Sequence, residues 1–203
     1  MEIERKYLVL DDLLSDLCGV FSYNIEQHYV SLNEFGGVIL GERKYPEKDK
    51  FYFIYVRSLE NPLIEIPKES YLALGGKKTV LADEEVRIRK CGDVHIFTIK
   101  SGGTFLREEK EVCIAPEIYD CLFSAAKGRT VEKKRYEIQL EGGRVAELDV
   151  YGGKHKGLKT VEVEFENRGD CGSFVPPAWF GGEITEDLRF KNRNLCTQAH
   201  SCK

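Results

Sequence analysis

Pairs of like-charged side chains recur at positions two residues apart along the chain. They are Glu2/Glu4, Arg87/Arg89, Glu109/Glu111, Lys133/Arg135, Glu147/Asp149 and Glu162/Glu164. In a β-strand, residues two apart point to the same face, so each pair would concentrate charge of one sign there. Like charges held together cost free energy unless a counter-ion or a ligand relieves them. These pairs are therefore the first candidates for binding and catalysis.

The types of charge in these pairs indicate which ligands they suit. Clustered carboxylates without neighbouring His or Cys favour a hard divalent cation, Mg²⁺ or Mn²⁺, over zinc. Clustered Arg and Lys supply the donors that phosphate oxygens require. Acids that hold cations beside bases that hold phosphates form the arrangement needed for phosphoryl transfer. The Gly-x-x-x-x-Gly-Lys-Ser/Thr loop is absent, and none of the four histidines has an evident Ser or Cys partner.

Alternation of polar and apolar residues predicts that strands carry most of these pairs. The predicted strands cover residues 2–8, 86–89, 95–100, 106–112, 131–137, 147–150 and 161–165. Gly-Gly pairs at 102–103, 142–143 and 152–153 are typical of the turns between antiparallel strands. Helices are predicted at 11–17, 116–123 and 185–190. Many strands and few helices indicate a barrel or a sandwich with peripheral helices.

The repeated like-charge pairs help to choose between these two architectures. In a sandwich the charged side of each strand faces bulk water, and for a single pair that is the ordinary explanation. Repetition of such pairs in one small domain favours a polar tunnel inside a closed barrel, with the apolar faces turned outward against helices.

The composition sets limits on the class of protein. A chain of 203 residues with 42% hydrophobic and 32% charged residues fits a globular protein with one sizeable core. A net charge of −4 argues against a coat for nucleic acid or anionic membrane. No apolar run approaches the length of a membrane span, and we expect no membrane partner.

The seven cysteines form no C-x-x-C pair and match no zinc spacing. We interpret them as reduced thiols of a cytoplasmic protein. We expect Cys171, Cys196 and Cys202 to lie in exposed polar surroundings.

The opening Glu2-Ile3-Glu4-Arg5-Lys6 resembles the E-x-E-x-K signature of the CYTH superfamily, the triphosphate tunnel metalloenzymes. The resemblance continues in order through residues 25–29, 86–89, 98–100, 107–111, 134–136, 147–150 and 161–164. It ends at residues 183–192, which are similar to the family's C-terminal E-V-T-x-D-x-R-Y-x-N stretch. The signature alone is weak, whereas the ordered series over nearly the whole chain is specific.

The resemblance implies an all-β-dominated (α+β) fold, a closed eight-stranded antiparallel barrel with peripheral helices, in a single domain over residues 1–203. It implies a metal cluster of Glu2, Glu4, Glu162 and Glu164, with Asp149 near it. Among these and their neighbours, the catalytic set would be Glu2, Glu4, Lys6 and Glu164. The phosphate-binding set would be Lys6, Arg87, Arg89, Lys100, Lys133, Arg135, Arg189 and Lys191.

Two assignments stay open at this point. Glu109 and Glu111 would either orient the bases as salt-bridge partners or share in metal binding. Lys134 would take the place of Lys133 if the strand register slipped by one residue.

An extended insertion at about 32–83 departs from the compact members of the family. It contains an aromatic strand-like run at 51–57 and a basic stretch at 43–46. We expect it to pack outside the barrel; a lid over the tunnel mouth is the alternative.

The predicted activity is metal-dependent hydrolysis of a triphosphate, with inorganic tripolyphosphate favoured because both chain ends resemble small prokaryotic triphosphatases. Thiamine triphosphate, a nucleoside triphosphate, an RNA 5′ end and cyclisation of ATP in the manner of class IV adenylate cyclases are the alternatives within the family. The partner is thus a triphosphate-bearing small molecule, with nucleic acid expected only as an RNA 5′ end, and members of the family are often homodimers. A non-catalytic triphosphate-binding module is the alternative from another class, and turnover distinguishes it.

Overall fold

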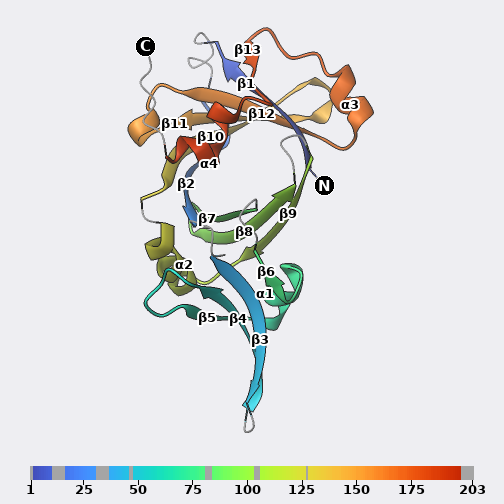
Figure 1. Cartoon of the computed structure of the whole chain (residues 1–203). Coiled ribbons are helices and arrows are strands. Elements are labelled where there is room, and N and C mark those ends of the chain that lie inside the picture. Colours follow the sequence, from blue (N-terminus) through green and yellow to red (C-terminus); the bar gives the residue numbers. More distant parts are fainter. Residues whose placement is uncertain are drawn as a thin grey trace. The chain divides into compact units, whose positions relative to one another are not determined.

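The computed structural model describes residues 2–10, 17–30, 37–45, 48–80, 84–102, 106–126 and 128–197. The chain divides into two compact units. The first unit holds Met1–Glu26, Gly103–Arg107 and Val131–Lys203, and the second holds Gln27–Gly102 and Glu108–Thr130. Strands dominate both units and the helices are short, as Figure 1 shows. The all-β-dominated class expected from the sequence is confirmed, and the single closed barrel stays a prediction.

Within the described residues, the strands and helices have the following bounds. The strands are β1 Glu2–Val9, β2 Ser22–Val30, β3 Val38–Tyr45, β4 Lys48–Val56, β5 Leu63–Ile66, β6 Lys78–Thr79, β7 Glu85–Cys91, β8 Val94–Gly102, β9 Leu106–Cys113, β10 Thr130–Gln139, β11 Val145–Tyr151, β12 Lys159–Phe165 and β13 Phe180–Glu183. The α-helices are α1 Lys68–Ala73, α2 Pro116–Phe123, α3 Arg168–Ser173 and α4 Asn192–Leu195. Short 3₁₀ turns are η2 Ser124–Ala126, η3 Glu141–Gly143, η4 Gly153–His155 and η5 Leu188–Phe190.

The first unit is an antiparallel sheet with one polar and one apolar face. β10 pairs with β11, β11 with β12, and β12 with β1, while β13 pairs along the other edge of β1. The register sets Lys6 opposite Glu162, and Glu162 opposite Glu147. Because successive residues on a strand alternate between faces, the polar side chains of β1, β10, β11 and β12 share one face.

The opposite face of this sheet forms an apolar core. Tyr7 of β1, Val161 and Val163 of β12 and Ala146 of β11 are buried there with Phe180 of β13. The predicted alternation thus separates the two faces as expected, and the segment after β12 covers the apolar one.

In the second unit, β7 and β8 form an antiparallel hairpin that turns at Gly92, which has a φ of 58°. β2 lies beside β7, and β9 lies beside β8. Alternation again gives this sheet two different faces: Ile88 and Phe97 point into a core, whereas Arg87 and its cross-strand partner Thr98 lie on the polar face.

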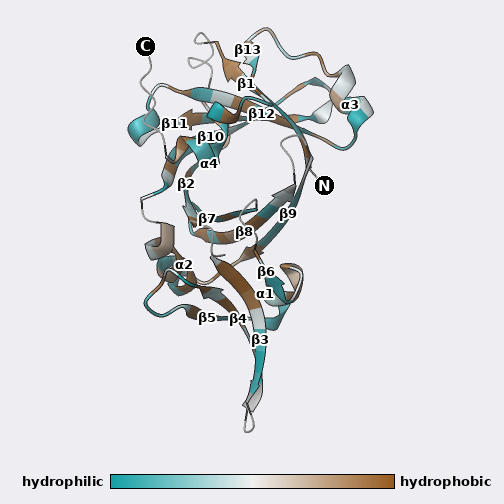
Figure 2. Ribbon diagram, in the orientation of Figure 1, coloured by the Kyte–Doolittle hydropathy of each residue, from teal (hydrophilic) through white to brown (hydrophobic). Residues whose placement is uncertain are grey.

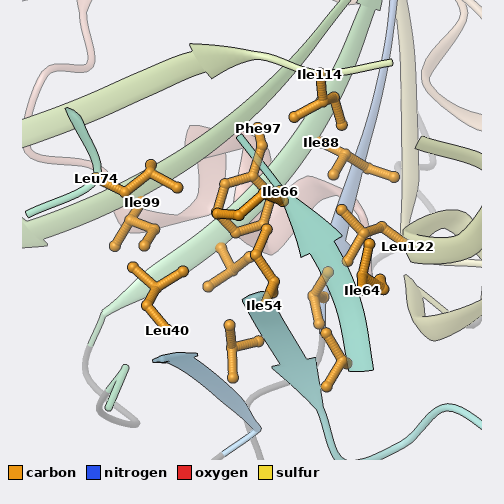
Figure 3. Close-up of a cluster of buried hydrophobic side chains, with 14 of the residues drawn as sticks. Leu40, Ile54, Ile64, Ile66, Leu74, Ile88, Phe97, Ile99, Ile114 and Leu122 are labelled. Atoms are coloured by element: carbon orange, nitrogen blue, oxygen red, sulfur yellow. The ribbon is translucent and has the colours of Figure 1, made fainter. Parts of the chain in front are cut away.

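The insertion forms a second, four-stranded sheet in the order β5-β4-β3-β6. Side chains from this sheet, among them Leu40, Ile54 and Ile66, gather with Phe97 and Ile99 of β8, as Figure 3 shows. The described part of the insertion therefore packs against the apolar face of β7 and β8. Helix α1 adds Tyr71 to the same core, the segment directly after its end adds Leu74, and α2 adds Tyr119 and Leu122.

Strand β3 changes character along its length. It begins with the buried residues Val38 and Leu40 and then carries the exposed Glu42, Arg43 and Lys44. Figure 2 shows this change from hydrophobic to hydrophilic. The start of the strand therefore belongs to the core, and the basic stretch noted in the sequence faces water.

The predicted helix at 116–123 is confirmed as α2. The one predicted at 185–190 is a 3₁₀ turn at Leu188–Phe190, where the Asp187 carboxylate accepts a hydrogen bond from the backbone N–H of Arg189. Of the helix predicted at 11–17, residues 11–16 lie outside the described residues. Among the described helices, none combines the length and the apolar character that crossing a membrane requires.

The cysteines in the described residues are all free thiols. Cys171 and Cys196 are only 5% and 3% exposed, so our expectation of exposed polar surroundings is wrong for both. Cys171 belongs to the core under β1 and β12, a contact between distant segments that local sequence does not reveal. Cys202 lies outside the described residues.

The packing of the second unit's core predicts that two isoleucines of the insertion contribute differently to stability. Ile54→Ala removes a side chain that is 0% exposed, and we expect the free energy of unfolding to fall by about 2–5 kcal/mol. Ile39→Ala is the matched control, because Ile39 is 37% exposed and should lose less than about 1 kcal/mol. Urea denaturation measures both, and equal losses would contradict the packing described for the insertion.

Candidate functional site

The polar face of the first unit holds four buried charged residues. Lys6, Lys133 and Arg135 are 7%, 5% and 6% exposed, and Asp149 is 0% exposed. Burial of a charge costs free energy unless an opposite charge and hydrogen bonds compensate it. The partners of these groups therefore define the site.

Asp149 on β11 is the centre of this arrangement. Its carboxylate accepts hydrogen bonds from Lys133 Nζ at 2.5 Å and from Arg135 Nε and Nη2 at 2.8 Å each. Burial alone would raise the pKa of Asp149, but the charges of Arg135 and Lys133 hold it below its ordinary value. One ionised carboxylate thus fixes both bases.

Glu162 on β12 partners the third base. Lys6 Nζ lies 2.8 Å from Glu162 Oε1, and Arg135 Nη2 lies 3.2 Å from Glu162 Oε2. Arg135 also forms an ion pair with Glu147. Burial opposes the charge on Lys6, but Glu162, Tyr151 and Asp149 together outweigh it and raise the Lys6 pKa. The positive charge of Lys6 is therefore stable in the folded protein.

Lys133 behaves differently from Lys6. Its burial, together with the nearby positive charge of Arg135, lowers its pKa to about 8 despite the attraction of Asp149. In the observed register Lys133 is buried opposite Tyr151, whereas Lys134 is exposed on the other face.

Glu4 and Glu164 form a pair of acids on the same polar face. They are direct partners across β1 and β12, with Glu4 half-buried and Glu164 exposed. Like charges directly opposite are unfavourable, and carboxylate oxygens are the donors a hard divalent cation prefers, so this pair fits such an ion. In the part of the chain that the structure describes, no group of three or more His, Cys, Asp or Glu side chains gathers around one point. The Glu2 side chain lies outside that part.

The polar face of the second unit holds a separate group of bases. Arg87 Nη2 donates to Glu109 and Glu111 at 3.0 Å each, and Lys100 forms an ion pair with Glu109. Arg89 Nη2 donates to Glu111 at 3.1 Å. Burial opposes the charge of Arg87, but nearby Tyr29 and these acids raise its pKa. Glu109 and Glu111 thus contact the bases directly, as salt-bridge partners would.

The two C-terminal bases lie in different surroundings. The Arg189 side chain is 74% exposed and donates to the carboxylate of Asp187 at 2.6 Å. Lys191 is half-buried at the start of α4. The described contacts of Arg189 therefore belong to its own turn and not to the buried group on the sheet.

Sequence reasoning missed several uncharged polar residues on these faces. Tyr151 donates from its hydroxyl to Asn192 Oδ1 at 2.7 Å, and its ring lies 5.9 Å from Lys133 Nζ. In the second unit, Gln27 Nε2 donates to the hydroxyl of Tyr29 at 2.9 Å, and both residues are buried. Each lies two residues from another polar residue of its strand, so the alternation that identified the charged pairs could have found them.

Two curated relatives and one solved structure that resemble this chain are inorganic triphosphatases. No family model matches the chain. It is 43% identical over 111 residues to an inorganic triphosphatase of Nitrosomonas europaea, a match covering 55% of this chain and 74% of that protein. It is 33% identical over 116 residues to an inorganic triphosphatase of Acetivibrio thermocellus, covering 56% and 72%. The crystal structure of the inorganic triphosphatase NE1496 is similar over 98% of this chain and 95% of that one, with 28% identity and a TM-score of 0.54.

The hydrogen bonds of Asp149 predict a large loss of stability when its charge is removed. Asp149→Asn leaves Lys133 and Arg135 buried beside each other without their shared anion, so the free energy of unfolding should fall by about 3–5 kcal/mol. Asp170→Asn makes the same chemical change in the partly exposed pair with Arg144 and should cost at most about 1 kcal/mol. Chemical denaturation compares the two, and a loss at Asp149 no larger than at Asp170 would refute the central role of Asp149.

Proposed function

The chain belongs to the CYTH superfamily, the triphosphate tunnel metalloenzymes, and we propose that it hydrolyses inorganic tripolyphosphate to pyrophosphate and phosphate in the cytoplasm. One observation carries the proposal: bases are buried on the polar strand faces, Lys6, Lys133 and Arg135 in the first unit and Arg87 and Lys100 in the second. Keeping cations out of water costs free energy. A polyanion bound beside these bases would form charge-assisted hydrogen bonds with each of them.

We propose further that the strands β1, β2 and β7 to β12 close into an eight-stranded antiparallel barrel whose polar faces line a tunnel. The support is that each unit separately presents a sheet with buried charges on one face and a hydrophobic core on the other. A triphosphate chain carries its charge along its whole length, which suits a lining with bases from several strands.

In this proposal the bases hold the phosphates and the acids have two roles. Asp149 orders Lys133 and Arg135, and Glu109 and Glu111 order the bases of the second unit. The carboxylates of Glu4 and Glu164, with Glu2 and Glu162, would hold Mg²⁺ or Mn²⁺. Such an ion neutralises charge on phosphate oxygens and activates water. The ordered bases stabilise the charge that develops on the leaving phosphate without rearranging.

A substrate panel tests the proposed function. The purified chain is incubated with tripolyphosphate, thiamine triphosphate, ATP and a 5′-triphosphorylated RNA, each with Mg²⁺ or Mn²⁺. Phosphate, pyrophosphate and cyclic AMP are measured. Tripolyphosphate should be the best substrate; binding without turnover would instead indicate a triphosphate-binding module.

The cross-strand pair Glu4 and Glu164 predicts that metal-dependent turnover requires both carboxylates. Glu4→Gln and Glu164→Gln keep the side-chain size and remove a charge that neutralises the ion, so turnover should fall at least about a hundredfold. Glu132→Gln is the matched control, because Glu132 is exposed on the opposite face of β10. Steady-state rates measure the effect. Rates within a few-fold of wild type for both variants would refute the assignment of Glu4 and Glu164 as metal ligands.

The basic group of the second unit predicts a loss of substrate affinity. Arg89→Ala removes a guanidinium on the polar face of β7, so KM for tripolyphosphate should rise about tenfold or more, as expected for a lost charge-assisted hydrogen bond. Lys90→Ala is the control, since Lys90 is exposed on the other face of the strand. Added salt should narrow the difference from wild type by screening the charge. An equal effect of both substitutions would show that the face of the strand is irrelevant to binding.

A further inference from the structure

A network of side chains lies along the edge of β1 that pairs with β13. Arg5 donates from Nε to Glu183 Oε1 at 3.1 Å and from Nη2 to Glu183 Oε2 at 2.6 Å. Arg5 Nη1 also donates to the backbone carbonyls of Cys171 and Phe174. These bonds tie the segment from α3 to β13 to the first strand, on the face away from the buried bases.

Thr185 extends this network to the backbone of Lys6. Its hydroxyl donates to Glu183 Oε1 at 2.7 Å and accepts from the backbone N–H of Lys6 at 3.0 Å. The backbone N–H of Ile184 donates to the carbonyl of Lys6 at 2.8 Å. Both backbone polar groups of Lys6 are therefore bonded by residues 184 and 185.

The pairing of β1 with β13 explains why a side chain is needed here. The register matches Tyr7 with Glu183 and Val9 with Phe180, with an irregularity between these pairs. Beyond Glu183 the strand ends. The hydroxyl of Thr185 takes the place of the backbone carbonyl that a continuing strand would offer to Lys6.

Lys6 connects this edge to the buried charges. Its side chain points to the polar face and contacts Glu162 at 2.8 Å, and Glu4 lies two residues away on the same face. A shift of the β1 backbone at Lys6 would move its ammonium group away from Glu162. A misplacement of about 1 Å at a reacting centre costs on the order of a hundredfold in rate.

We propose that Thr185 is a positioning residue for the reaction: held by Glu183 and Arg5, its hydroxyl fixes the backbone of β1 so that Lys6 meets the substrate in the correct place. The inference rests on the proposed function, because Lys6 is a phosphate-binding group only there. The hydroxyl is essential since it both accepts from Lys6 and donates to Glu183. Valine has the same shape and does neither, whereas serine does both.

The test compares Thr185→Val, Thr185→Ser and the control Thr79→Val, which removes the hydroxyl of an exposed threonine in the insertion. We expect Thr185→Val to lower kcat/KM for tripolyphosphate about tenfold, the value of one lost hydrogen bond of this kind. Thr185→Ser should stay close to wild type, and Thr79→Val should leave the activity unchanged. A fall in thermal midpoint for Thr185→Val with unchanged kcat/KM would overturn the proposal, because it would show a structural role alone.

A double-mutant cycle shows whether Thr185 acts through Lys6. In a Lys6→Gln background, Thr185→Val should have little further effect on kcat/KM, whereas in a Lys100→Gln background the two effects should be additive. Equal additivity in both backgrounds overturns the inference. If Thr185→Val does not fold, Glu183→Gln replaces it in the same double-mutant cycle. This substitution weakens the hydrogen bond that the Thr185 hydroxyl donates to Glu183, and the same pattern is expected.

Amide hydrogen exchange separates this inference from the proposed function. The backbone N–H of Lys6 should lose protection in Thr185→Val and keep it in Thr185→Ser. A wild-type protein without triphosphatase activity would refute the proposed function; unchanged protection of the Lys6 amide in Thr185→Val would refute the positioning by Thr185, whatever the activity.

Discussion

The shared anion of Asp149 is the interaction on which the polar face of the first unit depends. With Asp149 fully buried, Lys133 and Arg135 can stay out of water because each donates to its carboxylate. A buried ion pair contributes little net stability, since desolvation offsets the attraction between its members. The arrangement instead fixes the positions of the bases before a ligand arrives, so binding requires no costly rearrangement of charge.

Charged strand faces of this kind require an apolar cover on the other side. Alternation that places Arg87 on one face of β7 places Ile88 on the other, and Ile88 must be buried. The insertion solves this in the second unit by packing Leu40 and Ile54 against β7 and β8. In the first unit, Phe180 and the segment before it cover β1 and β12. The insertion is therefore part of what allows the polar face to exist.

Sequence could predict the strands and their faces because alternation is a local property. This pattern alone predicts that Arg87, Lys133 and Arg135 lie on polar faces. It could not predict which acid meets which base, since the contact of Lys6 with Glu162 depends on the register between strands far apart in the chain. The sequence does not predict strand β3, because the basic stretch after Gly41 breaks its alternation. Nor does it predict the burial of Cys171, which depends on distant contacts.

Strand β1 carries constraints on both faces and both edges. Arg5 and Lys6 are neighbours in sequence and point in opposite directions, one to Glu183 and the other to Glu162. β12 pairs along one edge of the strand, and β13 with Thr185 lies along the other. A strand held in this way cannot shift without breaking several bonds, which is what the alignment of Glu4 with Glu164 requires. The alternating residues of β1 therefore do two things: one set supplies charge to the polar face, and the other set holds the strand in place.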